Sequence, residues 1–125
     1  MIYRLLLVIA AAILFVGGTM HAMAFDKTIA AAAQSNLPPF FANSFLALWL
    51  IDSVTMVGLG LVFSLTALRP RAASAATIAL LALIPAGTAG LLYFYLGLFF
   101  AAHMLAGAAA SAMVAAMLSS NRTTD

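Results

Sequence analysis

The chain has 125 residues, of which 66% are hydrophobic and only 6% are charged. A soluble domain usually has about 25% charged residues, and a soluble fold of this size has too little interior to bury so much apolar surface. The composition therefore excludes a soluble globular protein and predicts an integral membrane protein. Five basic and three acidic residues are too few for a nucleic-acid interface. The lack of cysteine excludes disulfides, thiolate metal sites and cysteine nucleophiles.

The first apolar run covers residues 2–24 and begins beside Arg4. About 20 apolar residues are enough to cross a bilayer, so the run predicts a first transmembrane helix. It also resembles a cleavable signal peptide, because a basic start and an apolar core precede the small-x-small triplet Ala22-Met23-Ala24. The three apolar segments that follow favour an uncleaved helix, and cleavage of residues 1–24 stays open as the alternative.

Residues 25–44 form the predicted connection outside the membrane. Asp26 and Lys27 mark the membrane surface, and the alanine-rich stretch 28–34 favours a short helical continuation. Pro38-Pro39 then ends that helix, because prolines lack the backbone donor and clash with the preceding turn.

The charge-free run from residue 72 to residue 118 has 47 residues and must contain two crossings. A turn at residues 85–90 has good turn chemistry, but it leaves a third helix of only about 14 residues, too short for a bilayer. A turn near residues 95–97 gives two helices of full length and puts Pro85 inside the third, which neighbouring membrane helices tolerate. We therefore favour the second position.

The basic residues set the predicted orientation. Arg4, Arg69, Arg71 and Arg122 fall on one side of the four predicted crossings, and only Lys27 falls on the other. By the positive-inside rule, the N and C termini and the loop around Arg69 are cytoplasmic.

The predicted fold class is thus an all-α membrane protein in a plasma membrane, such as the bacterial inner membrane. It is a compact bundle of four transmembrane helices at residues 2–24, 45–67, 72–94 and 98–118 within one domain, 1–125.

The second span contains an aspartate, Asp52, and an ionisable group inside a bilayer costs about 2.5–3.5 kcal/mol on insertion scales. At about 1.5 Å per helical residue, Asp52 and His103 lie about 10 Å, and His21 about 7 Å, below the outer boundary. Apart from tyrosines, these three are the ionisable residues buried within the predicted spans. Because charges that face lipid are costly, we expect them to converge inside the bundle, in the outer leaflet.

Such a cluster has a limited chemistry. Desolvation disfavours the charged forms of aspartate and histidine, while pairing favours them. The cluster therefore predicts an acid/base couple for proton relay or for general acid–base work. Trp49 and Met56 lie three and four residues from Asp52 on one helix face, where they would wall an apolar pocket with a polar floor. The predicted ligand-binding residues are Trp49, Asp52, Met56, His21 and His103, and the catalytic candidates are Asp52, His103 and His21.

Each of these residues also has a structural interpretation. Asp52 can be protonated and bonded to Thr55 or to another helix, which would hold the bundle together. His21 is close enough to water to be an interfacial side chain. His103 has small residues on its face, and Trp49 lies deep enough for core packing.

Haem and copper are alternatives that the sequence supports poorly. His21 and His103 could ligate a b-type haem, and methionine thioethers suit Cu(I). Met20 and Met104, however, are sequence neighbours of the two histidines, so on a helix they point about 100° away from them. We expect no cofactor and no metal.

The span 98–118 is rich in alanine and glycine at small-xxx-small spacing, which allows close helix packing. It predicts a central helix or an interface in a homo-oligomer or a larger complex, and Gly58 and Gly60 suit close packing in the second span.

The leading hypothesis is a module that binds an apolar molecule of the lipid bilayer, such as a lipid, quinone or isoprenoid, or that relays a proton. One alternative is an accessory subunit whose polar residues serve packing only. Another is a lipid isomerase or cyclase. No phosphate loop, HExxH or GxSxG motif favours an enzyme.

Overall fold

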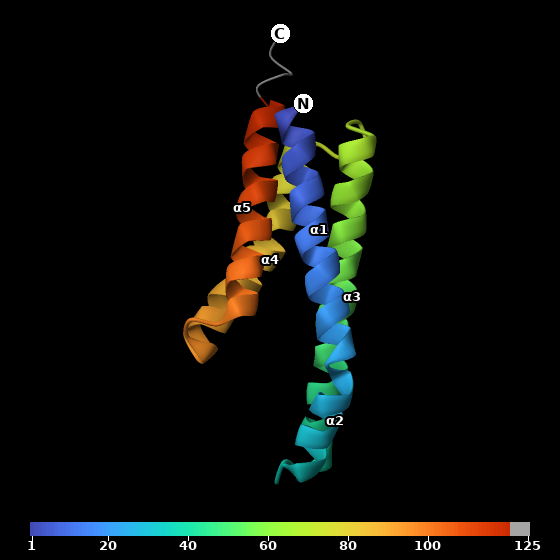
Figure 1. The fold of residues 1–125 in the computed structure, drawn as a ribbon, viewed down its shortest axis with the longest axis vertical. Coiled ribbons are helices and arrows are strands. Elements are labelled where there is room, and N and C mark those ends of the chain that lie inside the picture. The colour runs from blue at the N-terminus through green and yellow to red at the C-terminus, as the bar shows by residue number, and fades with distance from the viewer. Residues whose placement is uncertain (121–125) are drawn as a thin grey trace.

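The computed structural model describes residues 1–120, which form five helices and no strands. Arg122, one of the residues that predicted the orientation, lies outside this range. The helices are α1 (Ile2–Met23), α2 (Phe25–Gln34), α3 (Pro39–Leu68), α4 (Ala75–Leu96) and α5 (Phe100–Ser120) (Figure 1).

Four of these helices, α1, α3, α4 and α5, are long and apolar enough to cross a membrane. They have 21 to 30 residues and a mean hydropathy between 1.6 and 2.2. At 1.5 Å per residue the shortest is about 32 Å long, and the hydrocarbon core is about 30 Å thick. The predicted all-α fold with four spans is confirmed, and the chain is a multi-pass membrane protein.

The connection between the first two spans is more helical than predicted. Residues 25–34 form α2, and α3 begins at Pro39, six residues before the predicted start at residue 45. Proline breaks a helix from within, but at the first helical position its missing N–H needs no partner and its φ already suits the helix. With 30 residues, α3 is about 45 Å long, so it extends beyond the hydrocarbon core.

The turn between the last two spans lies at residues 97–99, at the favoured position. Helix α4 ends at Leu96, and Gly97 follows with φ = +70°, a conformation that glycine adopts without steric cost. Pro85 is buried inside α4, as expected. At the other end of α4, the Ser74 Oγ accepts a hydrogen bond from the Thr77 N–H at 3.1 Å and so caps the helix.

Helix α1 lies at the centre of the bundle. It packs against α3 on one side and α5 on the other, α4 packs against α5, and α3 and α4 hardly touch. The start of α1 and the end of α5 lie at the same end of the molecule, and from there the α4–α5 pair diverges from the α1–α3 pair (Figure 1). The largest fully buried side chains are Phe63, Leu7, Leu14, Ile78, Thr66 and Pro85.

Small residues allow these contacts. A Cβ at Gly18 would lie 3.0 Å from the Val57 Cγ2 and 3.1 Å from the Ser53 carbonyl oxygen, so α1 and α3 pack closely there. Gly60 has a similar role, but a Cβ at Gly58 would meet nothing within 4 Å. In α5 the buried residues are mostly alanines, at positions 102, 108, 109, 112, 115 and 116, which makes α5 a packing helix between α1 and α4.

We expect Gly18→Ala to lower the thermal stability of the protein relative to Gly58→Ala. Both variants gain the same helix propensity, about 1 kcal/mol. The difference in stability between them therefore reports the contact between α1 and α3 alone. Overpacking of a tight contact costs about 1–3 kcal/mol, and the free energy of unfolding of Gly18→Ala should fall by that amount relative to Gly58→Ala. The measurement is thermal unfolding of both variants in one detergent. Equal melting temperatures would contradict the close contact at Gly18.

Candidate functional site

His21 on α1 and Asp52 on α3 lie at one level of the bundle because of their spacing from two arginines. His21 follows Arg4 by 17 residues, and Asp52 precedes Arg69 by 17 residues. The two helices run in opposite directions, so equal counts from the shared end give equal heights. Seventeen residues span about 26 Å of helix. The couple therefore lies about 26 Å from the arginine end of the helices, a distance close to the thickness of a hydrocarbon core of about 30 Å.

The two side chains face each other across the α1–α3 contact. The His21 Nε2 lies 3.7 Å from the Asp52 Oδ2, within ion-pair distance but too far for a good hydrogen bond. Their side chains are 25% and 36% exposed, so both can be reached from the surface of the protein. The couple therefore joins α1 to α3 and still presents polar atoms outwards.

Two further residues fix the imidazole of His21. Its Nδ1 lies 2.9 Å from the Oγ of Ser53, a buried residue one position beyond Asp52. Its ring stacks on the Trp49 indole, with ring centroids 3.9 Å apart and an interplanar angle of 14°. The Trp49 Nε1–H donates to the His21 carbonyl at 2.8 Å. These contacts orient Nε2 towards the carboxylate.

The hydrogen bonds define where a titrating proton can reside. The Ser53 hydroxyl donates to the Trp49 carbonyl at 3.3 Å, so its oxygen is free to accept from the His21 Nδ1–H. In that arrangement a neutral imidazole has no hydrogen on Nε2. Nε2 and the ionised Oδ2 are then both acceptors, and one added proton at either atom turns their contact into an attraction. The geometry is that of a one-proton site.

His103 stays apart from this couple. It lies near the start of α5, 17 residues before Ser120, so by residue count its height resembles that of His21. Its Nδ1 lies 2.8 Å from the Phe99 carbonyl oxygen, and its ring meets Tyr93 edge-on at 5.3 Å between centroids. It is exposed on the α4–α5 pair, which diverges from α1 and α3 (Figure 1). The structure brings together His21, Asp52 and Trp49 but does not add His103.

Met56, predicted to wall a pocket with Trp49, packs into the core instead. The residue is 6% exposed. A Cβ added at Gly17 would lie 3.5 Å from the Met56 Sδ, and a Cβ added at Gly18 would lie 3.1 Å from the Met56 Cβ. Met56 thus fills the contact between α1 and α3. Within residues 1–120 no three histidine, aspartate or glutamate side chains gather as metal ligands.

Ser53 was missed by the sequence analysis. It lies four residues after Trp49, so the two share one face of α3. That face could have been recognised as the one directed at His21, because Trp49 and Ser53 are an aromatic and a polar residue at helical spacing beside Asp52. A serine in a membrane helix carries little information by itself, since it can donate to its own helix backbone.

Comparison with protein-family models, with curated proteins and with solved structures finds no match to this chain. The fold and the site therefore define only a class: a small multi-pass helical membrane protein with an Asp/His couple between two adjacent helices. Function has to be argued from the site.

We expect the fluorescence of Trp49, the single tryptophan, to report the charge of His21. Protonated imidazole in contact with indole quenches its emission more than neutral imidazole does. Emission should therefore be weaker in acid than in alkaline solution. The measurement is a pH titration of tryptophan emission in detergent.

His21→Gln should remove this pH response, while His103→Gln, a matched change on the other helical pair, should preserve it. A response lost in His103→Gln and kept in His21→Gln would refute the stacked arrangement.

Proposed function

We propose that the His21–Asp52 couple is the polar end of a binding site for an apolar molecule of the bilayer that has a hydrogen-bonding head, such as a lipid, quinone or isoprenoid. The couple holds one exchangeable proton and shares it with that head or with water. The observation that carries this proposal is the 3.7 Å separation of Nε2 and Oδ2, with Nδ1 already bonded to Ser53.

The exposure of the couple supports this proposal. The side chains of His21 and Asp52 are 25% and 36% exposed, so a ligand at the surface of the bundle can reach them. Intramembrane ionisable residues are expensive, and they commonly mark proton or substrate sites. Trp49 supplies a flat apolar wall beside the couple, and few polar groups in an apolar setting are typical of small-molecule sites.

We further infer that the couple lies near the outer surface of a plasma membrane, with the arginine-bearing end in the cytoplasm. Arg4, Arg69 and Arg71 belong to the end where α1 begins and α3 finishes. Lys27 lies on α2 at the opposite end, and the positive-inside rule favours the arginine-rich end as cytoplasmic. The ligand then enters from the outer leaflet.

One alternative has a specific observation in its favour. The bonds from His21 to Ser53, Asp52 and Trp49 all join α1 to α3, so the same group could act as a structural clasp in an accessory subunit of a larger membrane complex. In that case the loss of Asp52 costs stability rather than binding. The two functions are therefore separable by measuring stability and binding on the same variants.

We expect Asp52→Asn to weaken binding of a short-chain ubiquinone, used as the probe, by about tenfold, the effect of losing one charge-assisted hydrogen bond. Binding is measured by quenching of Trp49 emission at fixed detergent concentration. Asp26→Asn, which removes the same charge outside the predicted spans, is the matched control and should bind like the wild type.

A folded Asp52→Asn variant with wild-type affinity, or a wild-type protein whose emission the quinone leaves unchanged, would argue against this site. A melting temperature that falls in Asp52→Asn without any effect on quinone binding would favour the structural clasp.

A further inference from the structure

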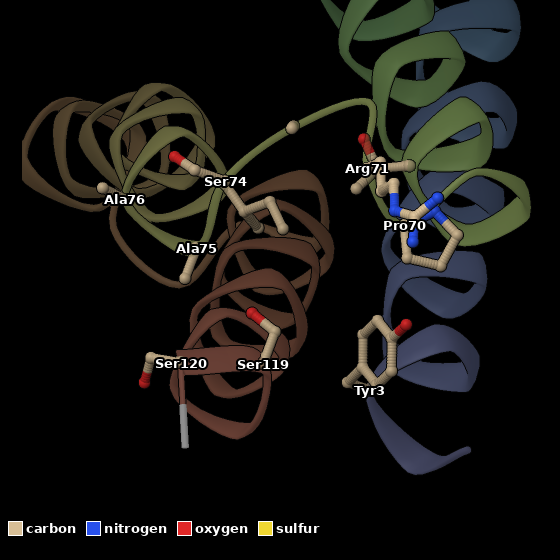
Figure 2. A pocket seen from close by; sticks show the side chains of 11 residues that line it. Tyr3, Pro70, Arg71, Ser74, Ala75, Ala76, Ser119 and Ser120 are labelled. Atoms are coloured by element: carbon tan, nitrogen blue, oxygen red, sulfur yellow. The ribbon is translucent and has the colours of Figure 1, made fainter. Parts of the chain in front are cut away.

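A cavity of about 600 Å³ opens at the end of the bundle opposite the couple. Four segments meet there: the first turn of α1, the loop between α3 and α4, the start of α4 and the end of α5 (Figure 2). Tyr3 stands on one side of the cavity, Ser119 and Ser120 on another, and Pro70 with Arg71 above (Figure 2). The cavity thus lies where the bundle reaches the membrane surface, and no part of the proposed function uses it.

Arginines surround this cavity. Arg71 lines it, and a neighbouring hollow of about 410 Å³ is lined by Arg4, Arg69, Pro70 and Arg71. The Arg4 Nε–H donates to the hydroxyl of Tyr3 at 3.2 Å, which connects the two hollows through a buried ring. All three guanidinium groups belong to exposed residues. Three positive charges therefore converge on one small area.

No carboxylate of residues 1–120 balances these charges locally. The acidic residues in that range are Asp26 and Asp52. Asp52 lies 17 residues from Arg69, about 26 Å along α3, and Asp26 lies on α2 at the far end of the molecule (Figure 1). The cluster therefore attracts an anion from outside the described chain.

The remaining lining of the cavity indicates which anion fits. Most of it is apolar, with Pro70, Ile78 and the alanines at positions 73, 75 and 76. The hydroxyls of Thr66, Ser119 and Ser120 already donate to backbone carbonyls of their own helices at 2.8–2.9 Å, so the donors left for an anion are mainly the guanidinium groups. Guanidinium binds phosphate through paired N–H groups. A phosphate attached to an apolar body fits this combination better than free phosphate does.

We propose that these two adjoining hollows bind one anionic phospholipid, with its phosphate among Arg4, Arg69 and Arg71 in the smaller hollow and its glycerol and first acyl carbons against the apolar lining of the larger cavity. Their position where the spans end puts them at the level of lipid headgroups, and basic clusters beside membrane helices attract anionic lipids. The site is independent of the His21–Asp52 couple.

The test compares lipid binding by the purified protein in detergent, using phosphatidylglycerol, phosphatidylcholine and sodium phosphate as separate probes, by native mass spectrometry and thermal shift. Phosphatidylglycerol should bind and raise the melting temperature more than phosphatidylcholine does at equal concentration. Arg69→Gln/Arg71→Gln should weaken phosphatidylglycerol binding by about tenfold or more, the effect expected for lost charge-assisted hydrogen bonds. Lys27→Gln, which removes a positive charge at the other end, should bind normally.

Ala76→Leu keeps every charge and fills part of the cavity from an exposed position on α4, so it tests the site even if the arginine variant fails to fold. It should also weaken phosphatidylglycerol binding. Equal binding of phosphatidylcholine, wild-type binding by Ala76→Leu, or equal losses in Lys27→Gln and the arginine variant would overturn the proposal. A thermal shift by sodium phosphate as large as that by phosphatidylglycerol would overturn the assignment to a lipid.

Discussion

The close approach of α1 and α3 at Gly18 is the constraint on which the rest of the site depends. Because Gly18 has no side chain, the two backbones come near enough for Met56 and Val57 to pack directly on α1. His21 lies three residues further along, on the same face of α1, so its ring is delivered to Ser53 and Trp49. A bulkier residue at position 18 would separate the imidazole from each of these partners at once.

This arrangement also explains how a membrane helix can contain an aspartate. Helices in lipid gain little from apolar contacts between them, so close packing and hydrogen bonds hold them together. Here the packing comes from glycines and from the alanines of α5, and the polar contacts of His21 with Ser53, Asp52 and Trp49 lie at one level of the α1–α3 pair. The position of α1 between α3 and α5 ties both pairs of helices to one central element.

The number of spans, their approximate limits and the turn at Gly97 were predictable, because the length and composition of an apolar run determine whether it crosses a bilayer. The pairing of His21 with Asp52 was also accessible, since helix rise converts residue counts into height. The order of the helices around the bundle axis could not be predicted in this way. The height of a residue along the bundle does not indicate which helices are neighbours. The sequence therefore predicted His103 beside His21 and Asp52, whereas the structure places it on the separate α4–α5 pair. The start of α3 at Pro39 was missed because proline interrupts a helix or begins one according to its position.

The height of the couple has an electrical consequence. A charge that crosses the whole membrane exchanges about 2.3 kcal/mol with a potential of 100 mV. With the arginines at one edge of a core about 30 Å thick, a proton that reaches the couple from the other edge would cross about 4 Å, or about one seventh of that field, which corresponds to about 0.3 kcal/mol. Exchange of a proton between the His21–Asp52 couple and the nearer aqueous phase would then hardly depend on membrane voltage.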